Sequence, residues 1–313
     1  MPRVSPKPSE LFHYTGPDLE EPGYTTYKHL RDDCELDCEY LEECWTKFKQ
    51  LGLADPDFLA RFPAECPERI WEMRLACILA GWGIDLVPSP RRGAGMDYGI
   101  RLKEGRTVWV EATAPRSGEG ADQVWAPNDT LLFGAEIERT TGLRYLNSIA
   151  KKREQFERAI QAQLVAPNDG LIIAISGVQI PLTDHQTPGE APLIVKVLFG
   201  LGDSPFLVDL HSGRSRRGPP MPRPSFRKSR GSNVPSRLFL TPDAGEVTGV
   251  LFDPYGPKNR PETRGCVAGH DFIFVHNPHA RVPLNIGQFG EGQEFFIRLD
   301  SIQQCARAEK APT

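Results

Sequence analysis

Several signatures of common protein classes are missing from this 313-residue sequence. No apolar run approaches the roughly 20 residues of a membrane-spanning helix, so we expect no membrane partner. The opening Met-Pro-Arg-Val-Ser-Pro-Lys-Pro contains no hydrophobic segment typical of secretory signals. Phosphate loops of the form Gly-x-x-x-x-Gly-Lys and serine elbows of the form Gly-x-Ser-x-Gly are also absent. These absences disfavour a membrane protein, a secreted protein, a P-loop nucleotide hydrolase and a serine hydrolase.

The seven cysteines are scattered and form no Cys-x-x-Cys pair. This spacing is more typical of reduced thiols than of a disulfide framework, so we expect a cytoplasmic location. The formal net charge is only −4, with 25% charged and 39% hydrophobic residues. Whole-molecule charge therefore does not indicate a polyanion partner, and any nucleic-acid interface must come from a local patch. The length suits one large domain or two smaller ones.

The most informative stretch is residues 95–113, where two β-type runs flank a Lys-Glu-Gly turn. We expect a hairpin with a three-residue loop at 103–105 and Gly105 in the left-handed conformation. This register gathers the apolar side chains on one face, which a two-residue loop would not do. The apolar face then consists of Tyr98, Ile100, Leu102, Val108 and Val110. Asp97 faces Glu111, with about 5 Å between their Cβ atoms.

Two carboxylates opposed across a strand pair repel each other. Asp97 and Glu111 therefore require either a neutralising cation or a raised pKa. A divalent metal is a natural cation for the pair, because magnesium prefers carboxylate oxygens. The alternative is a solvated hairpin face on which Asp97 only begins the strand.

Two predicted helices supply further candidates. The spacing predicts a helix over residues 67–81, in which Glu72 lies on an apolar stripe. A carboxylate there is costly unless it is paired, so Glu72 either joins a functional site or forms an ion pair with Arg69 or another arginine. A long helix predicted over residues 141–164 places Lys152 at the border of its buried stripe.

The remaining elements frame these candidates. Residues 1–25 are rich in proline and glycine and are expected to form an irregular arm. One helix is predicted over residues 27–51, with a solvated acidic face. Residues 170–177 form a continuous apolar run typical of a strand buried on both faces. Short β-type runs follow beyond residue 179.

The strongest basic cluster lies in the C-terminal half of the chain, where prolines, glycines and serines interrupt it. With Phe226 among them, these side chains are suited to follow a nucleic-acid phosphate backbone. The alternative is a disordered, solvated basic loop. The cluster consists of Arg214, Arg216, Arg217, Arg223, Arg227, Lys228 and Arg230.

Residues 67–177 contain a characteristic order of predicted elements. It begins with a helix that carries an inward glutamate, followed by a strand and by a hairpin with an aspartate and then a glutamate, and it ends with a helix and a buried strand. This order resembles the PD-(D/E)xK nuclease superfamily, which includes type II restriction enzymes and archaeal Holliday-junction resolvases. By position, Glu72 corresponds to the helix acid of that superfamily. Asp97 corresponds to its motif aspartate and Glu111 to its motif glutamate.

The sequence departs from that motif at its lysine, because position 113 is Thr113. Some members of the superfamily supply this lysine from a neighbouring helix, which makes Lys152 the candidate here. The resemblance implies that Asp97 and Glu111 hold Mg²⁺ or Mn²⁺ and that Glu72 and Lys152 complete the catalytic set. It implies a metal-dependent endonuclease that hydrolyses phosphodiester bonds in nucleic acid, with DNA as the partner, and it is compatible with a homodimer.

The expected fold is α/β, with a restriction-endonuclease-like mixed sheet flanked by helices. We predict an N-terminal arm and helical segment over residues 1–66 and a nuclease-like core over residues 67–180. A β-rich extension over residues 181–313 carries the arginine-rich loop and a frayed tail. The chain also resembles a group of uncharacterised bacterial proteins, which share Trp71-Glu72, Glu111-Ala112, Leu143-Arg144-Tyr145 and His276-Asn277-Pro278.

Two other interpretations stay open. In the first, the chain is a catalytically inactive module with a nuclease fold that binds nucleic acid or protein. In the second, it is a structural protein in which the acids form ion pairs with Arg69, Arg101 or Arg144.

Overall fold

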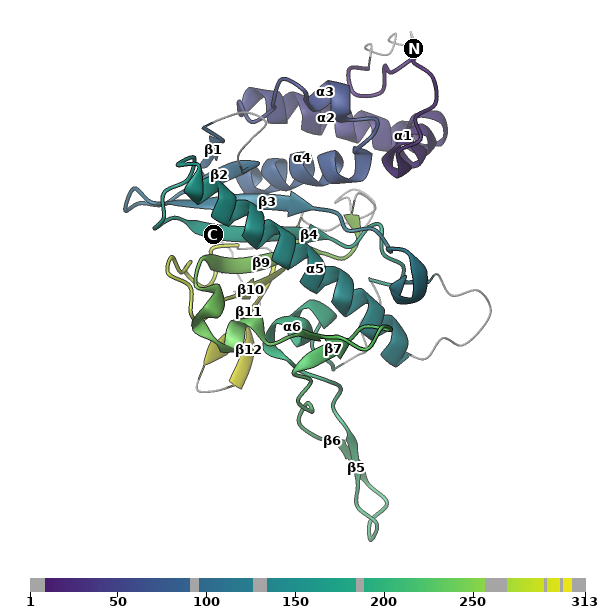
Figure 1. The fold of residues 1–313 in the computed structure, drawn as a ribbon, viewed down its shortest axis with the longest axis vertical. Helices are drawn as coiled ribbons and strands as arrows, with labels where there is room; N and C mark the ends of the chain where they lie inside the picture. Colours follow the sequence, from purple (N-terminus) through teal and green to yellow (C-terminus); the bar gives the residue numbers. More distant parts are fainter. Residues whose placement is uncertain are drawn as a thin grey trace, which may run out of the picture.

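The computed structural model describes residues 9–90, 96–125, 134–183, 189–256, 269–289, 292–298 and 301–305. A mixed sheet of eight strands runs through the body of the molecule, with helices on both of its faces (Figure 1). The strands, in spatial order, are β1 (Leu86–Pro88), β2 (Tyr98–Arg101), β3 (Thr107–Thr113), β4 (Gly170–Ser176), β9 (Val247–Asp253), β10 (Ile273–His276), β11 (Gln293–Arg298) and β12 (Ser301–Cys305). The expectation of an α/β protein with a mixed sheet flanked by helices is confirmed.

The sheet contains both parallel and antiparallel strand pairs. β3, β4 and β9 are parallel neighbours, whereas β1, β2 and β3 form an antiparallel meander. All seven residues of β4 are buried, as predicted for a central strand covered on both faces. Of the strands that follow residue 180, β9 to β12 continue the same sheet, because β9 pairs with β4 along its length.

The first face of the sheet is covered by helices α1 (Pro22–Asp33), α2 (Glu35–Gln50), α3 (Phe58–Arg61) and α4 (Cys66–Gly81). The helix predicted over residues 67–81 is therefore confirmed as α4. Its Trp71 Nε1 donates a hydrogen bond of 2.9 Å to the Ala174 carbonyl oxygen of β4. This bond fixes the helix over the centre of the sheet and sets the direction in which its other side chains point.

The single helix predicted over residues 27–51 is wrong. The chain breaks at Cys34, whose φ of −131° and ψ of 60° are not helical. A straight helix would separate Tyr27 from Phe48 by about 30 Å. In the structure Tyr27 contacts Phe62 and Phe48 contacts Phe58, and those two rings contact each other. Burial of both aromatic residues in one cluster therefore requires the turn between α1 and α2.

The opposite face carries α5 (Gly134–Gln161) and α6 (Leu193–Phe199). α5 is the long helix expected from the periodicity, although it begins seven residues earlier than the predicted start at residue 141. Two short hairpins follow α6: β5 (Phe206–Val208) with β6 (Ser215–Arg217), and β7 (Ser225–Arg227) with β8 (Asn233–Pro235). The first hairpin projects from the body of the molecule (Figure 1). None of the helices in the described ranges is long and apolar enough to cross a membrane.

A buried ion pair joins α4 to the end of β9. Arg74 Nη1 lies 3.2 Å from Asp253 Oδ2, and the two side chains are 2% and 0% exposed. We expect Asp253→Ala to lower the free energy of unfolding by about 3 to 5 kcal/mol, because it leaves a guanidinium buried without its counter-charge. The control is Asp85→Ala, which removes an exposed partner 3.9 Å from Arg101 and should cost under about 1 kcal/mol. Equal losses in urea unfolding would contradict this account.

Candidate active site

The hairpin that carries the predicted acids has the expected register. Tyr98 pairs with Val110 and Ile100 pairs with Val108. All four of these side chains are buried in the cluster beneath α4. Gly105 has a φ of +78°, the left-handed conformation that a three-residue loop requires at this position. The chain therefore enters β2 with Asp97 beside the strand position of Glu111.

Asp97 and Glu111 are held in place by contacts from two elements. The backbone N–H of Ala112 donates to Asp97 Oδ2 over 2.7 Å, which ties Asp97 to β3. Lys152 Nζ, from α5, lies 2.6 Å from Glu111 Oε2 and 3.3 Å from Gln155 Oε1. Glu111 is fully buried, and its second oxygen, Oε1, has no hydrogen-bond partner. One carboxylate oxygen is thus neutralised by lysine while the other stays unsatisfied.

Glu72 approaches the same place from α4. Its side chain is 8% exposed and accepts a hydrogen bond of 2.9 Å from Arg69 Nη1. Arg69 also contacts Asp55 Oδ2 at 3.1 Å and donates from Nε to Glu65 Oε2 at 3.0 Å. The ion pair between Glu72 and Arg69 that the sequence allowed is therefore present. It is one edge of a network that links α4 to the segment before it.

Burial and mutual repulsion dominate the electrostatics of these carboxyls. Burial, followed by the charge of Asp97, raises the pKa of Glu111 to about 8 against the lowering effect of Lys152. Burial and Asp97 also raise the pKa of Glu72 well above its usual value, although Arg69 opposes them. Burial raises the pKa of Asp97 itself. The cluster therefore binds protons more tightly than isolated carboxyls do and favours any added cation.

The same carboxylates favour the charged form of Lys152. Its burial disfavours the charged ammonium, but the carboxylates of Glu111 and Asp97 outweigh this and raise the pKa of the lysine. Its side chain is 19% exposed, so the ammonium group is held at the border between the core and the pocket. A lysine whose charged form is favoured at this position is suited to stabilise negative charge on a bound substrate.

A pocket of about 530 Å³ opens onto this cluster. Glu72, Asp97 and Lys152 line it, and so does Thr113, the residue at the motif lysine position. The structure therefore brings together all four of the predicted catalytic residues, since Glu111 lies against Lys152 beneath the pocket surface. The pocket lies between α4, the β2–β3 hairpin and α5.

Sequence reasoning missed several polar residues of this pocket. Gln155 follows Lys152 by three residues on the same helix, and this spacing was a usable signal. The others come from segments whose approach to the site depends on tertiary packing. They are Asp55, Arg61, Glu65, Glu68 and Arg116.

Two other arginines considered as partners of the acids lie elsewhere. Arg101 is exposed and faces Asp85, and Arg144 Nη2 donates to the Asp122 carbonyl oxygen over 3.1 Å. Of the three arginines named from the sequence, only Arg69 forms an ion pair with a predicted site acid within the described ranges.

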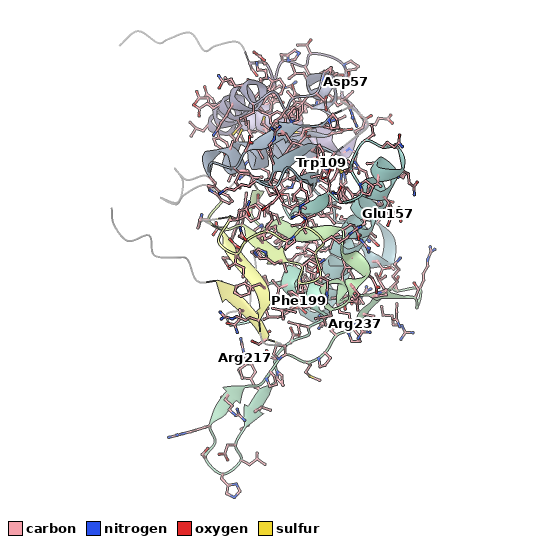
Figure 2. The ribbon with its side chains drawn as sticks, turned by 90° about the vertical axis from the view of Figure 1, so that its left-hand side faces the viewer. Asp57, Trp109, Glu157, Phe199, Arg217 and Arg237 are labelled. Atoms are coloured by element: carbon pink, nitrogen blue, oxygen red, sulfur yellow. The ribbon has the colours of Figure 1, made fainter. Side chains whose placement is uncertain are left out.

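The arginine-rich cluster does not lie at this pocket. It lies on the β5–β6 and β7–β8 hairpins and the segment between them, on the other side of α5 and α6 from α4 (Figure 1). Figure 2 places Arg217 at the base of the projecting hairpin and Trp109 of β3 in the upper part of the molecule. Arg217 lies 3.7 Å from Glu190, and Arg223 donates to Glu138 over 2.7 Å. These two arginines are therefore engaged by acidic side chains.

Comparison of the chain with protein-family models, curated proteins and solved structures gives no match. Among the residues that the structure describes, no group of three or more His, Cys, Asp or Glu side chains is placed to hold a metal ion. The arrangement in the pocket is instead a set of carboxylates neutralised by Lys152 and Arg69.

Proposed function

We propose that the chain is a metal-dependent phosphodiesterase that cleaves nucleic acid, with DNA as the substrate. The observation that carries the proposal is the contact of 2.6 Å between Lys152 Nζ and Glu111 Oε2, in a cluster with Asp97 and Glu72. A PD-(D/E)xK site requires a lysine beside the motif glutamate. This sequence lacks that lysine at position 113, and Lys152 occupies the place beside Glu111 instead. The order α4, β1, β2, β3, α5, β4 supports a restriction-endonuclease-like core.

The donor set suits a hard divalent cation. Glu111 Oε1 is buried and has no hydrogen-bond partner, and burial raises the pKa values of both Glu111 and Asp97, so a cation that replaces their protons is favoured. We propose that Asp97 and Glu111 hold Mg²⁺ or Mn²⁺, which prefer such oxygens. When bound, the ion lowers the pKa of a coordinated water and stabilises charge on the phosphoryl oxygens.

The chain itself would supply positioning and further charge. Lys152, oriented by Glu111 and Gln155, directs its ammonium group toward the developing negative charge on the phosphate. Glu72 is oriented by Arg69 and adds a third carboxylate to the pocket wall. Arg61 and Arg116 line the same pocket and are exposed, so they are suited to contact the flanking phosphates.

A second candidate is a nuclease-fold module that binds nucleic acid or protein without cleaving it. The observation that favours it is Thr113, which stands where the motif lysine would be. Salt-sensitive DNA binding with no cleavage in Mg²⁺ or Mn²⁺ would support this module over the enzyme.

The test is cleavage of supercoiled plasmid and of labelled single- and double-stranded oligonucleotides in Mg²⁺, Mn²⁺ or EDTA. We expect metal-dependent cleavage that falls about 10³-fold or more in Glu111→Gln and Asp97→Asn, because each removes a charged metal ligand. Glu104→Gln, in the exposed hairpin turn, is the matched control and should retain full activity. Cleavage that persists in EDTA or in both site variants would overturn the proposal.

Calorimetric titration of Mg²⁺ and Mn²⁺ provides an independent measurement. Wild type should bind one of the ions and Asp97→Asn should bind it more weakly. Equal absence of binding in both proteins would remove the metal from the proposal.

A further inference from the structure

The positive charge of the chain is concentrated in one segment. Residues 204–241 contain eight lysines and arginines and a single acid, Asp209, which gives the segment a formal charge of +7. Because the whole chain carries −4, the rest of the chain carries −11. Such separation favours a polyanionic partner for this segment.

The structure displays this segment as two antiparallel ribbons. The β7–β8 ribbon is docked on the body, because Phe226 is 3% exposed and lies against Gly142 of α5. The β5–β6 ribbon projects away from it (Figure 1). Its base is fastened by the Leu201–Pro222 bridge and by the contact between Arg217 and Glu190.

Apolar side chains on the projecting ribbon are unusually exposed. Leu210, at the turn between β5 and β6, is 91% exposed. The neighbouring strand adds Phe206 at 67%, Leu207 at 41% and Val208 at 57%. An isolated two-stranded ribbon is only marginally stable in water. Exposed apolar residues on such a ribbon indicate a binding surface rather than a structural element.

We propose that the β5–β6 and β7–β8 ribbons form an arm that binds duplex DNA, with Leu210 inserted between base steps. The inference rests on the proposed function for its choice of nucleic acid as the polyanion. Proteins that bend DNA combine arginines on the backbone with an apolar wedge, and a two-stranded ribbon fits a DNA groove. Arg214 and Arg216 are exposed on the first ribbon, and Arg227 and Arg230 on the second.

The location of the arm adds a consequence for the substrate. The projecting β5–β6 ribbon lies at the opposite end of the molecule from α4, which lines the carboxylate pocket (Figure 1). A duplex held by the β5–β6 ribbon therefore extends along the body before one of its phosphates reaches the carboxylate pocket. The substrate that uses both sites is a long duplex, which the wedge can bend toward the pocket.

Binding is tested with the full chain and a fluorescent duplex of about 40 base pairs, in EDTA and at several salt concentrations. Arg214→Ala with Arg216→Ala should weaken binding about tenfold and reduce the slope of log K against log salt by about 2, because each phosphate contact contributes about 0.9. The matched control is Arg101→Ala with Lys103→Ala, on the exposed β2–β3 hairpin, and should bind as wild type does. Equal affinity and slope in the arm variant and the control would overturn the arm.

The proposed wedge, Leu210, is tested separately by measuring DNA bending. Energy transfer between dyes at the two duplex ends should increase when wild type binds, and Leu210→Ser should abolish that increase without changing the salt slope. Leu36→Ser, which alters a 69% exposed leucine on α2, is the control. Bending that persists in Leu210→Ser, or binding restricted to single strands, would overturn the duplex wedge.

These outcomes separate the arm from the nuclease. All binding is measured in EDTA and repeated in the Glu111→Gln background, so cleavage contributes to neither readout. Loss of binding in the arm variant without any cleavage by wild type supports the arm and contradicts the nuclease. Metal-dependent cleavage with unchanged binding by the arm variant supports the nuclease and contradicts the arm.

Discussion

Lys152→Met is expected to reduce metal-dependent cleavage by about 10² to 10³-fold while leaving metal affinity intact or slightly increased. The loss follows from removing one preorganised charge that faces the phosphate. The preserved affinity follows because Lys152 shares Glu111 Oε2 and so competes with the cation for that carboxylate. Single-turnover cleavage and calorimetric titration measure the two effects separately. Lys151→Met, at the exposed neighbouring position, is the matched control.

A rescue variant makes this prediction specific to the position of the ammonium group. Thr113 lines the same pocket as Lys152. Thr113→Lys in the Lys152→Met background creates the Glu-x-Lys arrangement found in PD-(D/E)xK nucleases and should recover at least tenfold of the lost rate. Thr113→Met in that background adds bulk without charge and should recover nothing. Full activity in Lys152→Met would show that the lysine stabilises Glu111 rather than the reaction.

The parts of the site that were predictable from the sequence are those fixed by local pattern. Alternation of apolar residues through the β2–β3 hairpin permits one register in which a single face is buried, and that register places Asp97 beside Glu111. The helical period likewise placed Lys152 at the border of the buried stripe of α5. Both predictions depend only on residues that are close together in the sequence, so the sequence pattern alone is sufficient for them.

The parts that could not be predicted depend on how distant segments dock. Arg69 was foreseen as a partner of Glu72, but its contacts with Asp55 and Glu65 require the approach of the segment before α4. The arginine-rich cluster was expected at the substrate, and its placement at the far end depends on where β7 packs against α5. α6 was missed because its run Leu-Ile-Val-Lys-Val-Leu-Phe is buried almost throughout, which removes the amphipathic stripe that marks a helix.

In the absence of divalent metal, the free energy of unfolding is expected to fall as the pH rises from about 4.5 to about 8. The pKa of Glu111 is about 8 in the folded chain, against 4.5 for the ordinary group. Between these values the folded state holds a proton that the unfolded state has released, so the stability decreases with pH. The loss over this range is on the order of 4 kcal/mol for this one group. Glu72 and Asp97 act in the same direction, since burial raises both of their pKa values.

Urea unfolding between pH 4.5 and 8.5 measures this slope. Glu111→Gln cannot ionise at this position and should make the dependence shallower by the contribution of this group, whereas Glu104→Gln should leave it unchanged. Saturating Mg²⁺ should reverse the trend, because the cation binds the deprotonated carboxylate and displaces its proton. Titration at pH 7 in two buffers of different ionisation enthalpy should then show release of about one proton per ion bound. A flat pH profile in wild type, or metal binding without proton release, would contradict a carboxylate cluster that exchanges a bound proton for the metal ion.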